Sequence, residues 1–292
     1  MKIGWIGVGL MGSRMSKRLL KEGYELYVCD TSKDNIEMMV KEGASSVNTP
    51  GELVKCTDIV FCMIPNAIVL KKIMEDESGI LQSLPNGFTI VDMSTIDPDS
   101  SAEVAEMVES RGAHFLRSTV TGSTEFAENG TLGILVSGEP DVYEKVLPLL
   151  KIMGNRQHYL GDKEQARYMK ICINMMIGTS MQMLAESIVL GEKANLDWGK
   201  MIECLFDSAA ASSIMKSKLE MFTNKDFTPM CTATTLEKDL DIALLLGKKH
   251  AVSLPLTSIS RQNYAAMRSH DMGDLDYAGI LKVNEILNGI KE

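Results

Sequence analysis

Near its start the chain contains Ile3-Gly4-Trp5-Ile6-Gly7-Val8-Gly9-Leu10-Met11-Gly12, an apolar run that leads into three glycines spaced as GxGxxG. The glycines follow a predicted buried strand and open a predicted helix, and this context separates the motif from an ordinary tight turn. Gly7 permits a sharp turn, Gly9 lets a pyrophosphate approach the backbone, and Gly12 allows the helix to pack closely on the strand. The helix N-terminus offers N–H groups to phosphates. The stretch therefore predicts a dinucleotide site that includes Gly7, Gly9, Leu10, Met11 and Gly12.

An acidic residue follows at the spacing that such a site needs. Asp30 comes at the end of the second predicted strand, where a carboxylate accepts hydrogen bonds from the adenosine ribose hydroxyls. A carboxylate there would repel a 2′-phosphate, so NAD is favoured over NADP. Lys33 lies close by and could weaken this preference, which leaves NADP possible. The alternative interpretation of Asp30 is a solvated turn residue.

Short apolar runs alternate with helix-length segments up to about Gly161. Thr49-Pro50-Gly51-Glu52 and Asp97-Pro98 are typical helix starts, with a capping side chain followed by proline. Nearly all-apolar strands separated by helices indicate a parallel sheet that is covered on both faces. The expected strands are residues 3–8, 25–29, 59–64, 89–92, 113–116 and 133–137.

Beyond Gly161 the pattern becomes entirely helical. Residues 166–194 form one long, largely apolar predicted helix, whose wide apolar surface suggests burial between domains or between subunits of a dimer or tetramer. We therefore expect an α/β Rossmann domain with a mostly parallel, doubly wound sheet over residues 1–162. An all-α C-terminal domain that includes the long interdomain helix would occupy residues 163–292. The later helices are expected at residues 199–207, 212–222, 234–249, 256–269 and 277–289.

Composition excludes several classes of function. The formal net charge of −9 argues against nucleic-acid binding, and no apolar run is long enough to span a bilayer. The 6 cysteines form neither a CxxC pair nor a Cys/His cluster with zinc spacing, so no metal site is expected. Cysteines among apolar neighbours fit a reducing compartment. With no signal peptide ahead of the first strand, we expect a cytoplasmic protein without membrane or nucleic-acid partners.

Five further motifs carry a family resemblance over essentially the whole length. Together with the glycine motif, they resemble the β-hydroxyacid dehydrogenases, a family that includes 3-hydroxyisobutyrate dehydrogenase, tartronate semialdehyde reductase and glyoxylate/succinic semialdehyde reductases. The resemblance implies that Pro65 and Asn66 lie beside the cofactor and that Thr95 faces the nicotinamide and substrate. The motifs are Met63-Ile64-Pro65-Asn66, Asp92-Met93-Ser94-Thr95, Thr119-Val120-Thr121-Gly122-Ser123 with Ala127-Glu128-Asn129-Gly130-Thr131-Leu132, Lys170-Ile171-Cys172-Ile173-Asn174, and Lys238-Asp239-Leu240.

The segment around residue 121 reads as a loop from its residues alone. The resemblance implies that Thr121, Gly122 and Ser123 hold the substrate carboxylate through backbone N–H groups and a hydroxyl. The segment departs from the family pattern, because Arg117 replaces an aspartate, Thr119 a proline and Ser123 a second glycine. Arg117 is either a surface residue or an added positive charge near a more anionic substrate, and the residues leave both interpretations open.

Lys170 and Asn174 are four residues apart and so share one helix face. A lysine among apolar neighbours is costly unless it reaches water, a partner or a substrate; without the resemblance it would be read as a lysine that extends to solvent at a helix end. The resemblance implies that Lys170 is the general acid/base and that Asn174 orients the substrate, although Ile173 replaces the first asparagine of the family's KxxNN. It also implies that Lys238 reaches substrate or cofactor. Asp239 either holds Lys238, caps local structure or forms a surface ion pair.

These observations predict an NAD(P)-dependent oxidoreductase that interconverts a short 3-hydroxy acid and its semialdehyde. One alternative is a semialdehyde or sulfolactaldehyde reductase of the same family, since Asp92-Met93-Ser94-Thr95-Ile96 is similar to the corresponding segment of a sulfolactaldehyde reductase. Another is a non-catalytic dinucleotide sensor, because fold alone does not set function. Imine reduction is disfavoured, since related imine reductases usually replace the lysine that is kept here as Lys170.

Overall fold

The computed structural model describes residues 1–290 and contains two compact units. The first unit is Met1–Lys170 and the second begins at Ile171. The division falls inside helix α8 (Gln165–Lys193), which starts just after the expected domain boundary at residue 162. Within the described residues, no helix combines the length and the apolar character that crossing a membrane would require.

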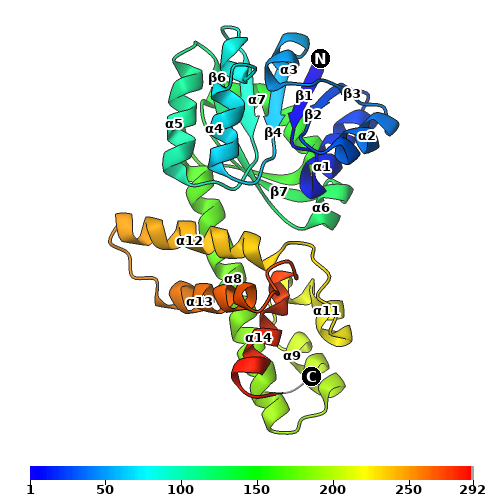
Figure 1. The fold of residues 1–292 in the computed structure, drawn as a ribbon, viewed down its shortest axis with the longest axis vertical. Coiled ribbons are helices and arrows are strands. Elements are labelled where there is room, and N and C mark those ends of the chain that lie inside the picture. The colour runs from blue at the N-terminus through cyan, green and yellow to red at the C-terminus, as the bar shows by residue number, and fades with distance from the viewer. Residues whose placement is uncertain (291–292) are drawn as a thin grey trace. The chain divides into compact units, whose positions relative to one another are not determined.

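The first unit is built on an eight-stranded sheet with the strand order β3-β2-β1-β4-β5-β6-β7-β8. Figure 1 shows this sheet with the helices that flank it. All neighbouring strands are parallel except β6 and β7, which confirms the mostly parallel sheet. Two strands were not expected: β3 is a pair of exposed serines, and β8 is a mostly polar edge strand without an apolar run. The strands are β1 (Lys2–Ile6), β2 (Glu25–Cys29), β3 (Ser45–Ser46), β4 (Ile59–Cys62), β5 (Thr89–Asp92), β6 (His114–Thr121), β7 (Leu132–Ser137) and β8 (Gly154–Tyr159).

Helices cover both faces of this sheet. On the interior strand β1, Trp5 belongs to an apolar cluster with Leu19 of α1, whereas the next residue, Ile6, belongs to a second cluster with Leu70 of α4. This alternation follows from the period of two in a strand, which turns successive side chains to opposite faces. The helical segments are α1 (Leu10–Lys21), α2 (Lys33–Lys41), α3 (Pro50–Cys56), α4 (Ala67–Glu75), the 3₁₀ turn η1 (Ile80–Gln82), α5 (Pro98–Glu109), α6 (Thr124–Asn129) and α7 (Pro140–Met153).

Strand β6 extends well beyond its parallel neighbour β5. The last residue of β5, Asp92, lies opposite Arg117, and β6 continues from there to Thr121. The expected strand at residues 113–116 was therefore too short, and Thr119–Thr121 is not a loop. The reason is tertiary, because β7 pairs antiparallel with residues 117–121 and supplies their backbone hydrogen bonds.

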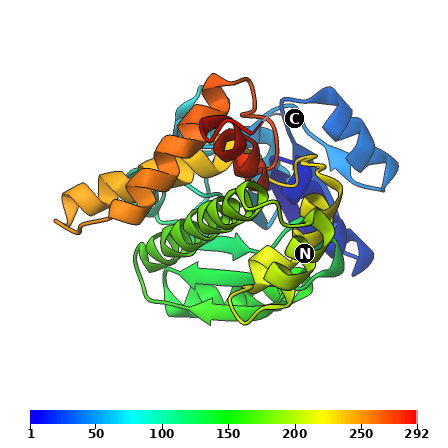
Figure 2. The same ribbon diagram turned by 90° about the horizontal axis from the view of Figure 1, so that it is seen from below.

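The second unit is helical throughout its described part, apart from one isolated bridge between Thr232 and Asp276. Two of its helices, α12 and α13, run side by side (Figure 2). The expected helix at 212–222 is instead two short helices, interrupted where Lys218 turns inward and binds the buried Asp276 at 2.8 Å. After α8 come α9 (Trp198–Asp207), α10 (Ser213–Lys216), α11 (Leu219–Asn224), α12 (Ala233–Lys249), α13 (Pro255–Ser269), η2 (Tyr277–Gly279) and α14 (Ile280–Leu287).

Candidate active site

The glycine motif forms the turn between β1 and α1. Gly7 has φ +86°, and a Cβ there would lie 2.2 Å from the carbonyl oxygen of Met63; a Cβ on Gly12 would lie 1.9 Å from the Gly7 oxygen. A Cβ on Gly9 would meet nothing within 4 Å. Gly7 and Gly12 are thus required by packing, whereas Gly9 borders open space at the N-terminus of α1. This arrangement fits a dinucleotide pyrophosphate, which binds where backbone N–H groups are accessible. The exposed Leu10 and partly buried Met11 form the first turn of α1.

Asp30 ties the end of β2 to the glycine turn. Its Oδ2 accepts a hydrogen bond from the Val8 N–H at 2.7 Å, and its Oδ1 accepts one from the Ser32 N–H at 2.8 Å. Each carboxylate oxygen has two lone pairs, so each can accept one more bond. Asp30 therefore lies beside the glycine turn, in a position that suits recognition of ribose hydroxyls.

The loops that follow β4 and β5 are joined by hydrogen bonds. The Ile64 N–H donates to Ser94 Oγ at 2.9 Å, and the Ser94 hydroxyl donates to Asp92 Oδ1 at 2.6 Å. Pro65 is exposed in the first of these loops, and Asn66 caps α4 by accepting from the Val69 N–H at 3.0 Å. The partly buried Thr95 follows Ser94 directly. Carboxyl ends of parallel strands are where open α/β sheets bind ligands, so these contacts shape the expected cofactor side of the site.

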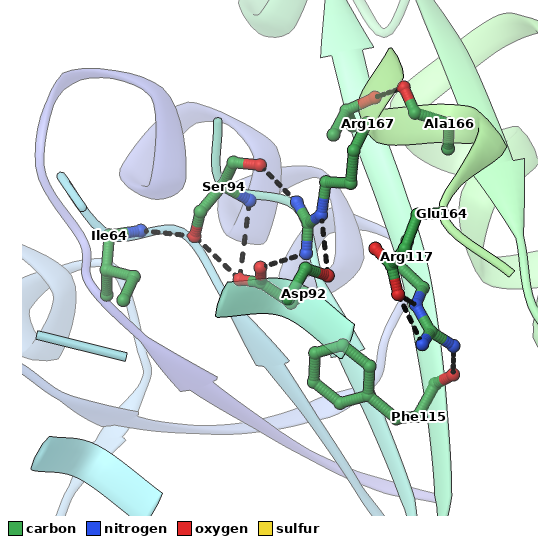
Figure 3. Close-up of polar contacts among 10 residues, drawn as sticks. Ile64, Asp92, Ser94, Phe115, Arg117, Glu164, Ala166 and Arg167 are labelled. Atoms are coloured by element: carbon green, nitrogen blue, oxygen red, sulfur yellow. Dashed lines mark hydrogen bonds and ion pairs between the residues drawn. The ribbon is translucent and has the colours of Figure 1, made fainter. Parts of the chain in front are cut away.

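A buried arginine at the start of α8 completes this cluster, as Figure 3 shows. Arg167 is only 1% exposed, and its guanidinium donates to the Asp92 carboxylate, to the Ser94 carbonyl and, at 3.1 Å, to Ser101 Oγ. Sequence reasoning did not find Arg167. Its partners lie 66 to 75 residues away along the chain, and no local spacing signals such a pair.

Two residues of β6 that depart from the family pattern, Arg117 and Thr119, also contact the segment that begins α8. Arg117 is only 3% exposed. Its Nε donates to Glu164 Oε1 at 2.7 Å, and its Nη1 donates to the Phe115 carbonyl at 3.0 Å (Figure 3). The guanidinium also lies over the Phe115 ring. The surface interpretation of Arg117 is therefore wrong, and its charge is balanced by Glu164 within the protein. Thr119 Oγ1 donates to the Ala166 carbonyl at 3.2 Å. Both replacements thus help to anchor α8.

The expected carboxylate site lies where β6 ends. Thr121 is the last strand residue, Gly122 has φ +130°, and Ser123 precedes α6 without capping that helix through its side chain. A Cβ on Gly122 would lie 2.9 Å from Leu132, so a small residue is needed at this left-handed position. The turn places backbone and hydroxyl groups beyond the carboxyl end of β5, as the strand register requires.

Helix α8 carries both Lys170 and Asn174, one turn apart. Lys170 is partly buried, while Asn174 is buried and donates from Nδ2 to Asp239 Oδ2 at 2.6 Å. Asp239 is 4% exposed and lies 3.0 Å, Oδ1 to Nζ, from the partly exposed Lys238. The interpretation of Asp239 as part of a surface ion pair is therefore wrong, since its carboxylate is buried and contacts both Asn174 and Lys238. The second unit thus brings together Asn174, Lys238 and Asp239.

Two buried cysteines of the first unit, Cys29 at the end of β2 and Cys62 at the end of β4, have raised pKa values. Burial and then the charge of Asp30 raise the pKa of Cys29 to about 11. Burial and then the charge of Asp92 raise the pKa of Cys62 well above its usual value. Both thiols stay protonated, and a protonated thiol is a poor nucleophile. Within residues 1–290, no three His, Cys, Asp or Glu side chains are grouped to hold a metal ion.

Family models match both units. Residues 2–175 match the NAD binding domain of 6-phosphogluconate dehydrogenase, and residues 165–284 match the domain described as NAD-binding of NADP-dependent 3-hydroxyisobutyrate dehydrogenase. The chain is 34% identical over 290 residues to 2-(hydroxymethyl)glutarate dehydrogenase of Eubacterium barkeri, covering 99% of this chain and 96% of that protein. It is 29% identical over 282 residues to glyoxylate/succinic semialdehyde reductase 1 of Arabidopsis thaliana, covering 97% and 98%.

A relative without an enzyme name also matches. The human cytokine-like nuclear factor N-PAC is 30% identical over 281 residues, covering 96% of this chain but only 51% of that protein, so this chain spans about half of N-PAC. Among solved structures, 3-hydroxyisobutyrate dehydrogenase of Mycobacterium tuberculosis superposes with a TM-score of 0.86 at 24% identity, covering 96% of this chain and 98% of that one. This last likeness confirms the fold.

Proposed function

This chain belongs to the β-hydroxyacid dehydrogenase family, and we propose that it uses NAD to interconvert a short 3-hydroxy acid and the corresponding semialdehyde. Its NAD-binding domain and its relatives make it an NAD(P)-dependent oxidoreductase. The observation that supports the assignment of residues is that Lys170 and Asn174 lie one turn apart on α8, together with the buried hydrogen bond from Asn174 to Asp239. Asn174 without a buried acceptor would be free to rotate, whereas here its amide is held in one orientation.

Lys170 moves the proton in this proposal. Oxidation of the hydroxy acid releases a hydride from C3 and a proton from the hydroxyl, and a bound nicotinamide takes the hydride. The Lys170 amine accepts the hydroxyl proton; in reduction, its ammonium donates a proton to the carbonyl oxygen. Asn174 orients the same oxygen, and Lys238 contributes positive charge toward substrate or cofactor, with Asp239 limiting the motion of both.

The substrate carboxylate is assigned to Thr121, Gly122 and Ser123. The positive φ of Gly122 bends the backbone so that it can offer N–H groups to an anion, and the Ser123 hydroxyl is not used to cap α6. Gly7, Gly9, Leu10, Met11 and Gly12 are assigned to the cofactor, together with Asp30, Pro65, Asn66, Thr95 and Lys238. NAD is preferred over NADP because the Asp30 carboxylate next to the Val8 N–H would repel a 2′-phosphate.

Two alternatives remain useful to test. A semialdehyde or sulfolactaldehyde reductase would use the same residues in the opposite direction, and the Arabidopsis relative carries a reductase name. A non-catalytic dinucleotide sensor is the other, since N-PAC carries the name of a nuclear factor. Lys170, Asn174 and Asp239 favour catalysis, because a sensor has no need for a proton-transfer group on the helix that carries the buried amide.

We also propose a cytoplasmic homo-oligomer, dimer or tetramer. Met176, Met183 and Leu190 are exposed at intervals of seven residues along α8, a spacing that lines up large apolar side chains for a second helix. Cysteines among apolar neighbours, such as Cys29 and Cys62, fit a reducing compartment. Sedimentation of the wild type against Met183→Glu tests the assembly, since a charge on this stripe is expected to produce smaller species.

The deciding experiment follows NADH and NADPH absorbance against a panel of 3-hydroxy acids, semialdehydes and sulfonated analogues. We expect turnover of one compound, and a loss of about 10²–10⁴-fold in Lys170→Ala, the usual contribution of a general acid/base. Cofactor affinity of the variant, measured by NADH fluorescence, should stay near that of the wild type. Near-normal turnover in Lys170→Ala would refute the role of Lys170, and cofactor binding without any turnover would favour the sensor.

A further inference from the structure

The guanidinium of Arg167 is buried where α8 begins and connects three segments of the first unit. It donates to the Asp92 carboxylate at the end of β5 and to the Ser94 carbonyl in the next loop (Figure 3). It also donates to Ser101 Oγ on α5. Asp92 is fully buried, and its other oxygen accepts from the Ser94 hydroxyl at 2.6 Å. Both side chains are fully buried, so the two charges balance each other inside the protein.

This geometry restricts the position of the helix more than a single ion pair would. A guanidinium is planar and presents its N–H donors in a fixed fork, so three acceptors on different segments determine its orientation. Removing one partner of a buried pair leaves an uncompensated charge, which makes alternative placements of the arginine costly. The backbone of Arg167 is thereby held in one place relative to Asp92 and Ser94.

Two hydrogen bonds hold the neighbouring residue on the sheet as well. The Ala166 N–H donates to Ser137 Oγ at 3.1 Å, and the Ala166 carbonyl accepts from Thr119 Oγ1 at 3.2 Å. The first turn of α8 is thus anchored to β6 and β7 through Ala166, and to β5 and the loop that follows it through Arg167. Lys170 lies three residues beyond Arg167 on the same helix, and Thr95 lies next to Ser94.

We propose that Arg167 is a positioning residue that keeps Lys170 in register with the loop of Ser94 and Thr95, acting through Asp92 and the Ser94 carbonyl. The proton-transfer group is attached to α8, while the loop after β5 is the segment assigned to the cofactor and substrate. A shift of α8 against this loop would displace the amine from the reacting oxygen, and small misplacements of this kind cost about 10²-fold in rate. This inference rests on the proposed function of Lys170.

A purely structural role makes a different prediction, and Arg117 provides the matched control. Arg117 is also a buried arginine that holds the segment leading into α8, through Glu164. Its backbone lies opposite Asp92 in the sheet, but its guanidinium binds Glu164 and the Phe115 carbonyl instead of the Asp92 carboxylate and the Ser94 carbonyl. We would compare Arg167→Lys with Arg117→Lys, since lysine keeps the charge and loses the fork. Both variants are expected to melt at lower temperature than the wild type.

The first measurement is hydrogen exchange of the unliganded proteins. In Arg167→Lys, amides of residues 93–96 and 167–170 should exchange faster together, whereas Arg117→Lys should leave residues 93–96 unchanged. Unchanged protection of 93–96 in a folded Arg167→Lys protein would overturn the inference, whether or not the protein turns over any tested substrate. Hydrogen exchange tests the position of α8 and does not depend on turnover. A failure of the proposed function can therefore be told apart from a failure of this inference.

The second measurement is turnover of 3-hydroxyisobutyrate and of succinic semialdehyde, with the deuterium isotope effect from C3-deuterated alcohol or 4,4-dideuterated NADH. Arg167→Lys should lower kcat about 10–100-fold, with a larger isotope effect and a NADH affinity within about 2-fold of wild type. Arg117→Lys should keep kcat and the isotope effect of the wild type. Equal kcat losses in both variants would show that the arginines only stabilise the fold.

Discussion

Asn174 and Asp239 form a buried hydrogen bond of 2.6 Å between helices α8 and α12, and Asp239 lies 3.0 Å from the Lys238 ammonium. One carboxylate thus orients an amide and restrains a cation, the two groups in the second unit that the family resemblance assigns to the substrate. Because the carboxylate is nearly inaccessible to water, both interactions are stronger than they would be at the surface.

Replacing Asp239 should therefore impair catalysis more than folding. In Asp239→Asn the side chain loses its charge, so Lys238 loses its counter-ion and Asn174 loses a strong acceptor. We expect kcat/KM to fall about 10–100-fold, because a buried charge-assisted hydrogen bond contributes about 1.5–3 kcal/mol. Asp241→Asn is the control, since Asp241 pairs with Arg261 in a more exposed position at 2.7 Å. Similar kinetics in the two variants would contradict the role of Asp239.

Two glycines of the GxGxxG turn should respond differently to alanine. Gly9→Ala introduces a methyl group that meets no atom within 4 Å, so the melting temperature should stay unchanged while NADH binding weakens. Gly7→Ala combines φ +86° with a 2.2 Å approach to the Met63 oxygen, so this variant should lose stability. Calorimetry and NADH fluorescence separate the two effects. Normal NADH affinity in Gly9→Ala would place the pyrophosphate elsewhere.

The charge of Asp30 should determine the choice between the two cofactors. Asp30→Asn keeps an oxygen that can accept from the Val8 N–H and removes the charge that would face a 2′-phosphate. We expect the preference for NADH over NADPH, measured as the ratio of dissociation constants, to fall about 10-fold, which corresponds to about 1.4 kcal/mol. Asp34→Asn, an exposed change in the first turn of α2, should leave the ratio unaltered. An unchanged ratio in Asp30→Asn would remove Asp30 from cofactor recognition.

Cys29 should make the protein less stable in alkali. Its pKa is raised from 9.0 to about 11, so the folded state holds the proton more tightly than the unfolded chain. The resulting stabilisation is complete below pH 9 and is lost as pH rises toward 11. The urea midpoint of the wild type should therefore fall between pH 8.5 and about 10.5, under reducing conditions, more steeply than that of Cys29→Ala. Cys204→Ala, at an exposed position, serves as the control and should keep the wild-type slope.

Local patterns in the sequence determined the alternation of strands and helices, the helix starts at Thr49-Pro50 and Asp97-Pro98, and the glycine turn. In the structure Thr49 and Asp97 do cap their helices, because capping depends only on residues three positions away. The same locality explains why Lys170 and Asn174 could be placed on one face of a helix before any tertiary contact was known. The motifs then indicated the family, and the family models and relatives confirmed it.

Tertiary structure alone decided the features that depend on partners distant in the chain. Strand β6 reaches Thr121 because β7 pairs with it, and β8 forms although its residues are mostly polar, because β7 offers a free edge. The sequence left two interpretations of Arg117 open. In the structure Arg117 forms a buried ion pair with Glu164, which lies 47 residues away along the chain. Arg167 gave no sequence signal at all. A buried charge is tolerated only where the folded chain assembles its acceptors, and no local pattern records where that happens.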